Sequence, residues 1–436
     1  MSTPGISGAL MPEQQRELDY LLSPVAIRER AGRLFVAAEA GQTHFAIHPE
    51  RVGPVVDFVI EVIRQNYPDL KIPFHSRWGH FRVGGLDRVA RLNERLKAAF
   101  PGEGSGARDE RARAKLDLVV ASVLLDAGAG EAWRYREPSS GQSFGRSEGL
   151  AVASLDLFLA GAFSHDAAQP LQVTAAGLEN LTRERLEQGF QVTADNPLIG
   201  VEGRLKLLRS LGAALRGNPE IFRDARPGNL LDAVRRAGGG FAAAVGGLVA
   251  SAPGVPATTL LRFVLDGLGP IWPGRVQLYG VNLGDCWRHP LLGALDSTTS
   301  LMPFHKLSQW LTYSLIEPIE EAGVPITHVQ DMTGLPEYRN GGLLLDRGVL
   351  SLRNPADAET GHRPDSELIV EWRALTVVLL DRIGAEVRTK LGFSNVDFPL
   401  AKVLEGGTWW AGRIAAKELR ADGSPPLKLD SDGTVF

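Results

Sequence analysis

The sequence contains a single cysteine, Cys286, among its 436 residues. An internal disulfide is therefore impossible, and the cysteine-rich zinc patterns are excluded. Long apolar runs are also missing, because no stretch approaches the roughly 20 consecutive apolar residues of a membrane helix. The opening MSTPGISGALMPEQQ lacks the basic and apolar regions of a signal peptide. We therefore expect a cytoplasmic protein without a membrane partner.

Neither sign of charge dominates, because 47 basic and 51 acidic residues give a formal net charge of -4. Proteins that follow duplex nucleic acid need a basic block to neutralise phosphates, and no such block occurs here. Several cofactor and catalytic signatures are missing as well, namely GxGxxG, GxxxxGKS/T, GxSxG and HExxH. We therefore expect neither a nucleic-acid polymer as partner nor a bound cofactor.

Apolar residues recur at helical spacing through most of the chain, whose hydrophobic content is 44%. The clearest predicted helices span residues 21–41, 48–66 and 110–128. The second should stop at Tyr67, because the residue before a proline is driven out of the helical region. Short alternating patterns predict strands at residues 43–48 and 274–287. The predicted fold class is mainly α with a few short strands.

The ends and one internal loop suggest the organisation of the chain. Residues 1–15 are small and polar, as in a flexible tail. PGEGSGARDE, residues 101–110, is rich in glycine and charge and predicts an exposed loop. Residues 16–436 then form one large helical unit, or two packed lobes of about 16–100 and 110–420 with the site between them. No fixed-period repeat occurs, which disfavours a solenoid.

PFHKLSQW and DMTGLPEYR are the segments richest in reactive side chains. On a helix, Lys306 and Gln309 share one face at i,i+3 spacing. A hairpin through the connecting GVPITHVQ would present Asp331 and Glu337 opposite the lysine. The structural alternative, a solvated lysine and a capping or ion-pair cluster at residues 337–339, stays open.

Two histidine pairs are weaker candidates. His44 and His48 have the i,i+4 spacing of two metal ligands on a helix, but the strand predicted there argues against a metal site. HSRWGHF would grip an anion or a metal through His75, Arg77 and His80. A packed loop in which these residues cap neighbouring segments is the favoured alternative, so no metal is expected.

SSGQSFGRSEGLA has the composition of a phosphate cradle. Serine hydroxyls, glycine amides and Arg146 precede a predicted helix, whose N-terminus would attract an anion. Glu148 would accept a hydrogen bond from a ribose hydroxyl. A capped loop is the structural alternative.

Seven motifs resemble those of the uracil-catabolism protein family of fungi and bacteria: HSRWGHF, SFGRSEGL, NPLIGVEGR, DARPGNL, LGPIWP, FHKLSQWLTYSLIEPIE and DMTGLPEYRNGG. Weaker collinear segments between about residues 28 and 390 resemble the queuosine salvage proteins, which are nucleotide N-glycosylases. LPEYRNGG is similar to their ADYR segment, and FHKLSQW to their YKRAQ segment. This second resemblance implies a helical fold like that of the DNA glycosylases.

Together the resemblances imply an N-ribosyl hydrolase of uracil catabolism. Its substrate would be a ureido-ribose 5-phosphate, and its products urea and ribose 5-phosphate. N-glycoside hydrolysis passes through an oxocarbenium-like transition state, which a carboxylate beside C1 stabilises. Glu337 matches the aspartate of ADYR and would be that carboxylate, either as nucleophile or as the base that activates water. Lys306 matches the lysine of YKRAQ and would hold the phosphate or assist at the sugar.

The departing urea needs a proton or a hydrogen bond as its bond breaks. We expect catalysis from Glu337, Asp331, Lys306 and Asp126. Substrate contacts are expected from His305, Gln309, Tyr338, Arg339, Trp133, Arg146 and Glu148. LDAGAGEAW has small residues where the salvage proteins have bulky ones, which implies a leaving group smaller than 7-deazaguanine. The expected partner is a phosphorylated ribosyl small molecule, and a homodimer stays open.

Two other functions stay open. A metal-dependent hydrolase of the ureide amide bond in the same pathway would use the histidines and lose activity on chelation. A non-catalytic partner of the ring-opening enzyme would bind the intermediate without turnover.

Overall fold

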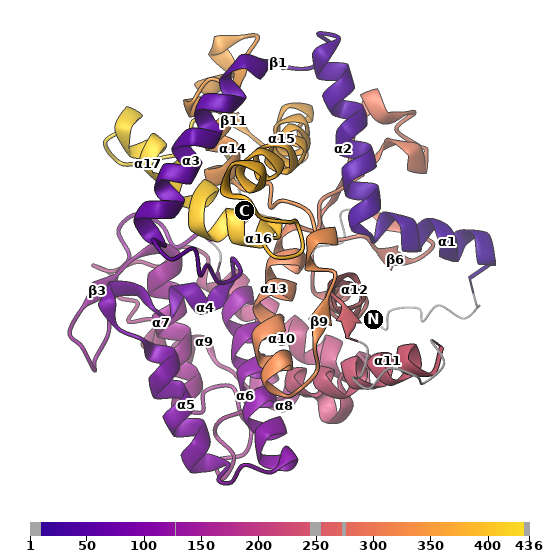
Figure 1. Cartoon of the computed structure of the whole chain (residues 1–436). Helices are drawn as coiled ribbons and strands as arrows, with labels where there is room; N and C mark the ends of the chain where they lie inside the picture. The colour runs from indigo at the N-terminus through magenta and orange to yellow at the C-terminus, as the bar shows by residue number, and fades with distance from the viewer. Residues whose placement is uncertain (1–9, 127, 245–253, 273–275, 431–436) are drawn as a thin grey trace. The chain divides into compact units, whose positions relative to one another are not determined.

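The computed structural model describes residues 10–126, 128–244, 254–272 and 276–430 (Figure 1). Helices make up most of these residues and the strands are short, so the predicted mainly α class is confirmed. The resemblance to DNA glycosylases in fold stays a prediction. Two compact units divide the chain. Unit 1 comprises Met1–Phe74, Pro273–Gln309 and His328–Val435, and unit 2 comprises His75–Trp272 and Trp310–Thr327.

Unit 1 consists of helices and four small two-stranded sheets. Its helices are α1 Pro12–Leu21, α2 Pro24–Glu39, α3 Val52–Asn66, α14 Tyr338–Asp346, α15 Glu367–Leu391, α16 Leu400–Val403 and α17 Trp409–Leu419. Its antiparallel pairs are β1 (Phe45–Ile47) with β10 (Leu350–Leu352), β5 (Gln277–Leu278) with β6 (Val281–Asn282), and β7 (Cys286–Arg288) with β8 (Leu301–Pro303). β11 (Gly361–His362) pairs in parallel with β12 (Lys428–Leu429).

The central helix of unit 1 is α15, which lies between α2 and α3 in Figure 1 and contacts both. The run from Leu368 to Val377 is buried on every face of the helix. A helix that is buried all round must satisfy its charged side chains internally, since an unpaired buried charge is costly. Two such residues, Glu371 and Arg373, lie in this run. Their partners therefore define polar sites inside unit 1.

The regular structure of unit 2 is mainly helical. Its helices are α4 Arg77–His80, α5 Arg88–Ala99, α6 Ser105–Leu124, α7 Arg146–Leu159, α8 Ala175–Glu179, α9 Arg183–Gly189, α10 Val201–Gly217, α11 Leu230–Ala244 and α12 Ala257–Leu268. β2 (Tyr135–Arg136) pairs antiparallel with β3 (Ser143–Phe144), and β4 (Val255–Pro256) pairs in parallel with β9 (Ile326–Thr327). The helix α13, Lys306–Glu321, contributes its first four residues to unit 1 and the rest to unit 2.

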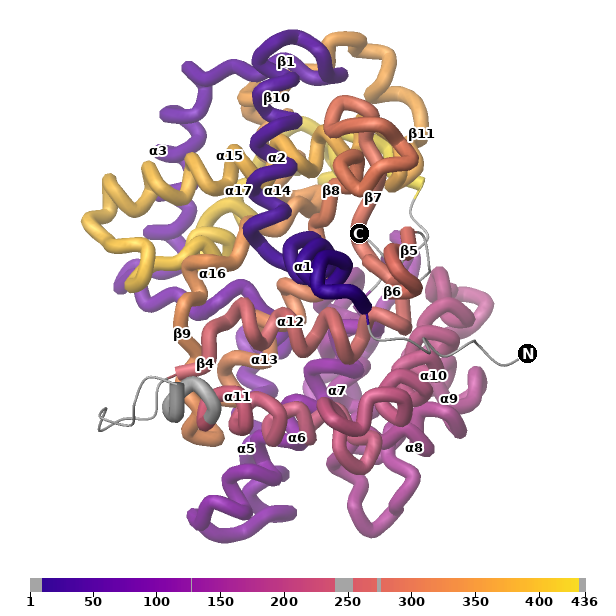
Figure 2. The backbone as a smooth tube through the Cα atoms, turned by 90° about the vertical axis from the view of Figure 1, so that its right-hand side faces the viewer, coloured from indigo at the N-terminus to yellow at the C-terminus, as the bar shows by residue number. Residues whose placement is uncertain are grey.

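The central helix of unit 2 is α6. Every residue from Ala114 to Leu124 is buried, including Lys115 and Asp117. α5 and α7 both contact it, and Figure 2 shows α8, α9 and α10 grouped together in the same unit. Like the buried run of α15, this run is covered on every face, and its charged residues need partners from other segments.

One predicted helix boundary is confirmed, because α3 ends before Tyr67 as expected. The helix predicted over 21–41 is α2, which begins later, after Ser23, whose hydroxyl accepts from the backbone N–H of Ala26. The strand predicted at 43–48 corresponds to β1. The start of the segment predicted at 274–287 lies outside the described residues, and its described part is divided into β5, β6 and the start of β7 instead of one strand.

Two predicted loops are shorter than expected. Residues 12–15 of the predicted tail begin α1, while residues 1–9 lie outside the described ranges. The predicted loop at 101–110 ends at Gly104, where α6 begins. The charged residues Asp109 and Glu110 look exposed in the sequence, but they pair with arginines of α11 and of the segment before it.

The two units also alternate along the chain, whereas the predicted lobes follow one another.

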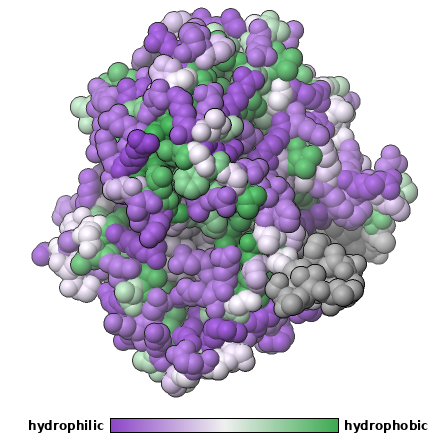
Figure 3. All heavy atoms as spheres, in the orientation of Figure 1, coloured by the Kyte–Doolittle hydropathy of each residue, from purple (hydrophilic) through white to green (hydrophobic). Residues whose placement is uncertain are grey.

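Polar residues predominate on the face shown in Figure 3, with apolar residues in smaller patches between them. Within the described ranges, no helix combines the length and the apolar character that crossing a membrane requires.

Candidate functional site

A buried ion pair between Asp285 and Arg373 connects several segments of unit 1. Nη1 and Nη2 of Arg373 donate to the two carboxylate oxygens of Asp285, each at 2.7 Å. The indole Nε1 of Trp287 donates to the same carboxylate at 2.8 Å. Burial raises the pKa of Asp285, but the Arg373 charge and these hydrogen bonds outweigh burial and hold the pKa well below its ordinary value. The carboxylate is therefore charged at neutral pH and holds its neighbours in place.

The same ion pair holds the starts of two helices that carry predicted catalytic residues. The backbone N–H of Lys306, the first residue of α13, donates to Asp285 Oδ2 at 3.0 Å. Nε of Arg373 donates to the carbonyl of Pro336 at 3.3 Å, and Pro336 directly precedes Glu337. One carboxylate and one guanidinium thus link the backbone at Lys306 to the backbone beside Glu337.

Glu337 is the N-cap of α14. Its two carboxylate oxygens accept from the backbone N–H groups of Arg339 and Asn340, each at 2.7 Å. These bonds satisfy donors that have no partner within the helix, and they place a negative charge at the positive end of the helix dipole. The capping role considered as an alternative is therefore present. Capping therefore orients the carboxylate, and the half-buried side chain keeps part of its surface exposed.

Gln309 is fully buried, and its amide is bonded inside unit 1. Nε2 donates to Thr333 Oγ1 at 2.8 Å and to the carbonyl of Phe304 at 3.1 Å, while Oε1 accepts from the Thr333 backbone N–H at 3.0 Å. The amide thus fixes α13 to the segment that leads to Glu337. Gln309 therefore positions α13, and this role takes the place of the substrate contact that we expected from the sequence.

His305 is also buried, and its backbone has a left-handed φ of 49°. Its Nε2 lies 2.9 Å from the carbonyl of Leu21, so that nitrogen carries the proton. Burial lowers the pKa of the imidazole, which is therefore neutral at pH 7. With 1% of its surface exposed, His305 positions the start of α13 and does not present its ring to a ligand.

The other candidates of unit 1 differ in their exposure. Arg339 is buried. Its guanidinium lies 4.8 Å from the centroid of the Tyr338 ring, and Nη1 donates to the carbonyl of Gly423 at 2.8 Å. Arg339 therefore has a structural role in place of the expected substrate contact. Asp331 is exposed and Tyr338 is half-buried, so both retain surface for a ligand.

A surface pocket of about 650 Å³ adjoins this cluster through Trp287. Its lining residues are Val276, Trp287, Arg288, Arg363, Pro364, Asp365 and Asp430. The volume lies within the roughly 300–1,000 Å³ of small-molecule sites. Arg363 is paired with Asp365 at 2.7 Å. Arg288 bonds to the carbonyls of Leu295 and Ser297, and within the described ranges no carboxylate pairs with it. Its charge is therefore available to an anionic group.

A second polar cluster, in unit 2, surrounds Arg77 at the start of α4. Arg77 is fully buried, and its Nε donates to Ser122 Oγ at 2.7 Å. Nη1 donates to Asp126 Oδ2 at 2.8 Å, and Cζ lies 5.8 Å from the centroid of the Trp310 ring. Ser122 Oγ is also 2.6 Å from Ser154 Oγ on α7. The predicted catalytic Asp126 is thus paired with an arginine from HSRWGHF.

Burial and charge together set the protonation states of this cluster. Burial lowers the pKa of Arg77, and the charges of Asp126 and Glu148 oppose that shift. The pKa of His80 is lowered to about 4, first by burial and then by the Arg77 charge, so His80 is neutral at pH 7. Burial also lowers the pKa of Arg204 to about 10, against the charge of Asp126. The cluster therefore combines two guanidinium charges with the carboxylates of Asp126 and Glu148.

The remaining candidates of unit 2 lie at different depths. Trp133 is fully buried and its indole Nε1 donates to the carbonyl of Phe190 at 2.9 Å, so the ring has no exposed surface for a substrate. Arg146, the exposed first residue of α7, and Glu148, half-buried in the same turn, retain such surface.

Sequence reasoning missed Asp285, Ser122 and Arg204, because nothing in their local sequence distinguishes them from ordinary polar residues. It weighed Arg77 within HSRWGHF but favoured a packed loop. His44 flanks strand β1, and its Nδ1 lies 2.8 Å from Oε2 of the buried Glu371. Within the described ranges no three His, Cys, Asp or Glu side chains are arranged to hold a metal ion.

Comparison with known proteins gives a family for the chain. A family model described as a protein of unknown function, DUF1688, matches residues 20–436. Protein urg3 of Schizosaccharomyces pombe (strain 972) is 41% identical over 423 residues, which cover 95% of this chain and 98% of that protein. Uracil catabolism protein 4 of Lachancea kluyveri is 40% identical over 450 residues, which cover 96% and 99%. Because the similarity extends over almost the whole of each protein, the chain belongs to the DUF1688 family.

Proposed function

We propose that this chain is an N-ribosyl hydrolase of uracil catabolism, which converts a ureido-ribose 5-phosphate to urea and ribose 5-phosphate. Water supplies a hydroxyl to C1 of the ribose, the C1–N bond breaks, and the leaving nitrogen takes the proton. The pathway is supported by a relative named for uracil catabolism. The N-glycosidase chemistry is supported by the resemblance of LPEYRNGG and FHKLSQW to the queuosine salvage motifs, and that resemblance itself stays a prediction.

One observation carries the proposal. Lys306 is the first residue of α13 and Glu337 is the N-cap of α14, and the Asp285–Arg373 ion pair holds the backbone at both helix starts. The sequence predicts that these two side chains lie opposite each other. An ion pair whose bonds are all made internally is a rigid support. Rigid support is what an electrostatic catalyst needs, because a carboxylate stabilises a developing cation best when it is already oriented.

In this proposal Glu337 faces the anomeric carbon. Its charge stabilises the oxocarbenium-like transition state directly or activates the attacking water. Lys306 or the pocket residue Arg288 holds the 5-phosphate, because each offers a cation to an anionic group. Tyr338 and Asp331 are the candidates of unit 1 for hydrogen bonding to the departing urea. Asp126, beside Arg77 in unit 2, stays a further candidate for that role.

The test is incubation of the purified full chain with synthetic ribosylurea and its 5-phosphate, with urea release followed by a coupled assay. We expect the phosphorylated compound to be hydrolysed. Glu337→Gln should reduce kcat/KM at least about 100-fold, while one amide oxygen still caps α14. The matched control is Glu367→Gln, which changes an exposed glutamate in the first turn of α15 and should leave turnover unchanged.

Other outcomes would contradict the proposal in distinct ways. Binding of the phosphorylated compound without urea release would favour the non-catalytic partner. Activity that is lost on chelation and restored by a divalent metal would favour the ureide amide hydrolase. Equal turnover by Glu337→Gln and the parent protein would remove Glu337 from the reaction.

A further inference from the structure

The motif DARPGNL, residues 224–230, has no role in the proposed reaction but builds a strained turn in unit 2. Asp224 and Ala225 both have left-handed backbone, with φ of 57° and 50°. Residues with a side chain rarely adopt this conformation, and it persists only where the surrounding structure holds it. Strain of this kind is concentrated at ligand-binding and active sites, which makes the surroundings of this turn a candidate for a ligand site.

The turn places Arg226 against α6. A Cβ atom at Gly228 would lie 2.4 Å from the carbonyl oxygen of Arg113, so only glycine fits there. The Gly228 N–H donates to Asp117 Oδ1 at 2.6 Å. Arg226 Nε donates to Asp117 Oδ2 at 2.7 Å and Nη1 to Glu110 Oε2 at 2.8 Å. Two carboxylates thus fix the guanidinium.

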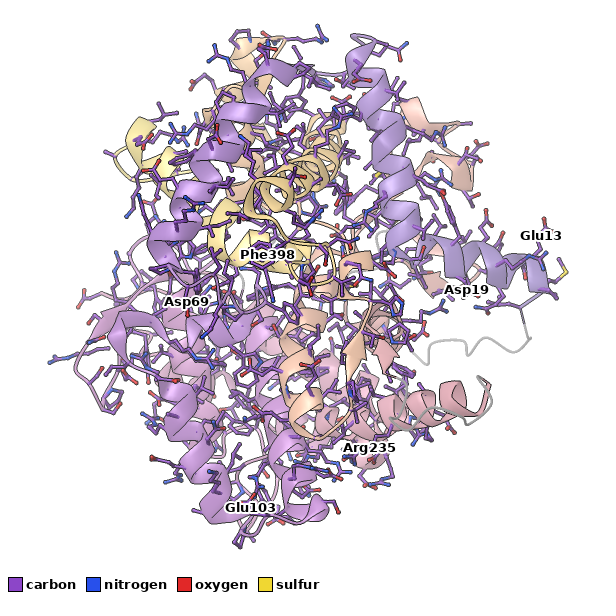
Figure 4. The ribbon with its side chains drawn as sticks, viewed as in Figure 1. Glu13, Asp19, Asp69, Glu103, Arg235 and Phe398 are labelled. Atoms are coloured by element: carbon purple, nitrogen blue, oxygen red, sulfur yellow. The ribbon has the colours of Figure 1, made fainter. Side chains whose placement is uncertain are left out.

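The arginines around this turn are all paired with carboxylates. Arg235, labelled in Figure 4, is paired with Asp109, with Nη2 2.6 Å from Oδ1. Arg113 Nη2 is 2.7 Å from Asp232 Oδ1. The network contains four arginines and five carboxylates: Arg113, Arg223, Arg226 and Arg235 with Asp109, Glu110, Asp117, Asp224 and Asp232. The guanidinium of Arg226 therefore has hydrogen bonds to offer but no excess charge to attract an anion.

Arg226 lines a pocket of about 180 Å³, which is smaller than the pockets of drug-sized ligands. Phe100, Pro170 and Leu171 give it apolar walls. Arg226 Nη2 is buried and has no hydrogen-bond partner among the described residues. Gln172 Nε2 donates to Ser164 Oγ at 3.3 Å, which leaves the Gln172 carbonyl oxygen as an acceptor. The pocket therefore has an apolar wall and one acceptor, and the unpaired Nη2 donor belongs to a lining residue but is covered in this structure.

We propose that this pocket binds a small neutral amide, imide or ureide. The carbonyl of such a ligand accepts from Arg226 Nη2, and its N–H donates to the oxygen of Gln172. Because Nη2 is covered in this structure, binding requires a local shift of the pocket wall, which includes the exposed residues Ala168 and Gln169. The carboxylates of the network outnumber its arginines by one, which disfavours phosphate and carboxylate ligands because they would bring an uncompensated negative charge. The site lies within unit 2 and does not depend on the proposed reaction at Glu337.

The test measures binding to the full chain by ligand-observed NMR and calorimetry. Uracil and N-methylurea are the neutral probes, and acetate and inorganic phosphate are the anionic ones. Ala99→Trp fills the pocket from the exposed end of α5 without touching the ion-pair network, and it should weaken binding of a neutral probe at least tenfold. Ala98→Trp adds the same ring to the neighbouring exposed position, which does not line the pocket, and should leave binding unchanged.

Two further variants separate this site from others. Arg226→Lys retains the charge beside Asp117 but removes the free Nη2 donor, so it should weaken the neutral probe as Ala99→Trp does. Glu337→Gln should bind that probe like the parent protein, whether or not it releases urea. The inference is overturned if neither neutral probe binds at millimolar concentration, if Ala99→Trp binds like Ala98→Trp, or if the anions compete for the pocket.

Discussion

Replacing Arg373 with glutamine would leave Asp285 as a buried carboxylate without its counter-charge. The change removes two hydrogen bonds of 2.7 Å and leaves the Trp287 indole and the Lys306 backbone N–H as donors. Removing one partner of a buried ion pair costs about 3–5 kcal/mol. Asp285 keeps two donors and 15% of its side chain is exposed, so we expect the lower end, about 3 kcal/mol. For a unit of this size the melting temperature should fall by about 6–12 °C.

The decrease in the free energy of unfolding caused by Arg373→Gln should depend on pH in a defined direction. In the parent protein the pKa of Asp285 is held well below its ordinary value, so its contribution to the free energy of unfolding is present at neutral pH and is lost only in strong acid. Without Arg373, burial dominates and raises the pKa of Asp285 above the ordinary value of about 3.9. The variant is then least stable, relative to the parent, at neutral pH. The difference narrows as the pH falls toward about 4 and the carboxyl takes up a proton.

Guanidinium chloride unfolding and thermal melts at several pH values would measure this difference. The matched control is Arg363→Gln, which removes a bidentate pair with Asp365 at the exposed surface and should change the free energy of unfolding by less than about 1 kcal/mol. A difference for Arg373→Gln that is equally small, or that is constant with pH, would refute the reasoning.

Two further predictions concern unit 2. The folded-state pKa of His80 is about 4, so the unfolded state binds more protons between about pH 6.5 and 4 and stability should decline as the pH falls through that range. His80→Asn should flatten this decline in thermal unfolding curves, and an unchanged slope would contradict the assignment. Trp133→Phe leaves the carbonyl of Phe190 without its donor and should lower the free energy of unfolding by about 1–3 kcal/mol, measured by denaturant titration. Because the ring is fully buried, KM for any substrate should not change. A raised KM would instead support the predicted contact between Trp133 and the substrate.

The sequence correctly predicted the helices and strands that are determined by neighbouring residues in the chain. Helix α3 ends at Tyr67 because the next residue is proline, and the strand at residues 45–47 follows from β-branched and aromatic content before another proline. The start of α6 was predicted too late, because Asp109 and Glu110 are satisfied by arginines more than 100 residues away. No local pattern reveals such a partner.

The same division applies to the candidate site. Lys306 and Glu337 were predicted as site residues because reactive neighbours lie close to them in the chain and because their segments resemble the queuosine salvage motifs. Asp285 was missed because its partner Arg373 lies 88 residues away, on a helix whose pattern indicates only burial. Trp133 and Gln309 were assigned to the substrate because residue type does not tell whether an aromatic or amide side chain faces a ligand or the core.

The position of α15 has a consequence for biosynthesis. α2 and α3 are made first, but the helix they enclose lies at residues 367–391. During translation the apolar faces of these early helices must therefore remain uncovered until most of the chain has left the ribosome, while residues 75–272 of the other unit have already emerged. Nascent chains that stall before residue 367 should accordingly be recognised by chaperones through their first 70 residues.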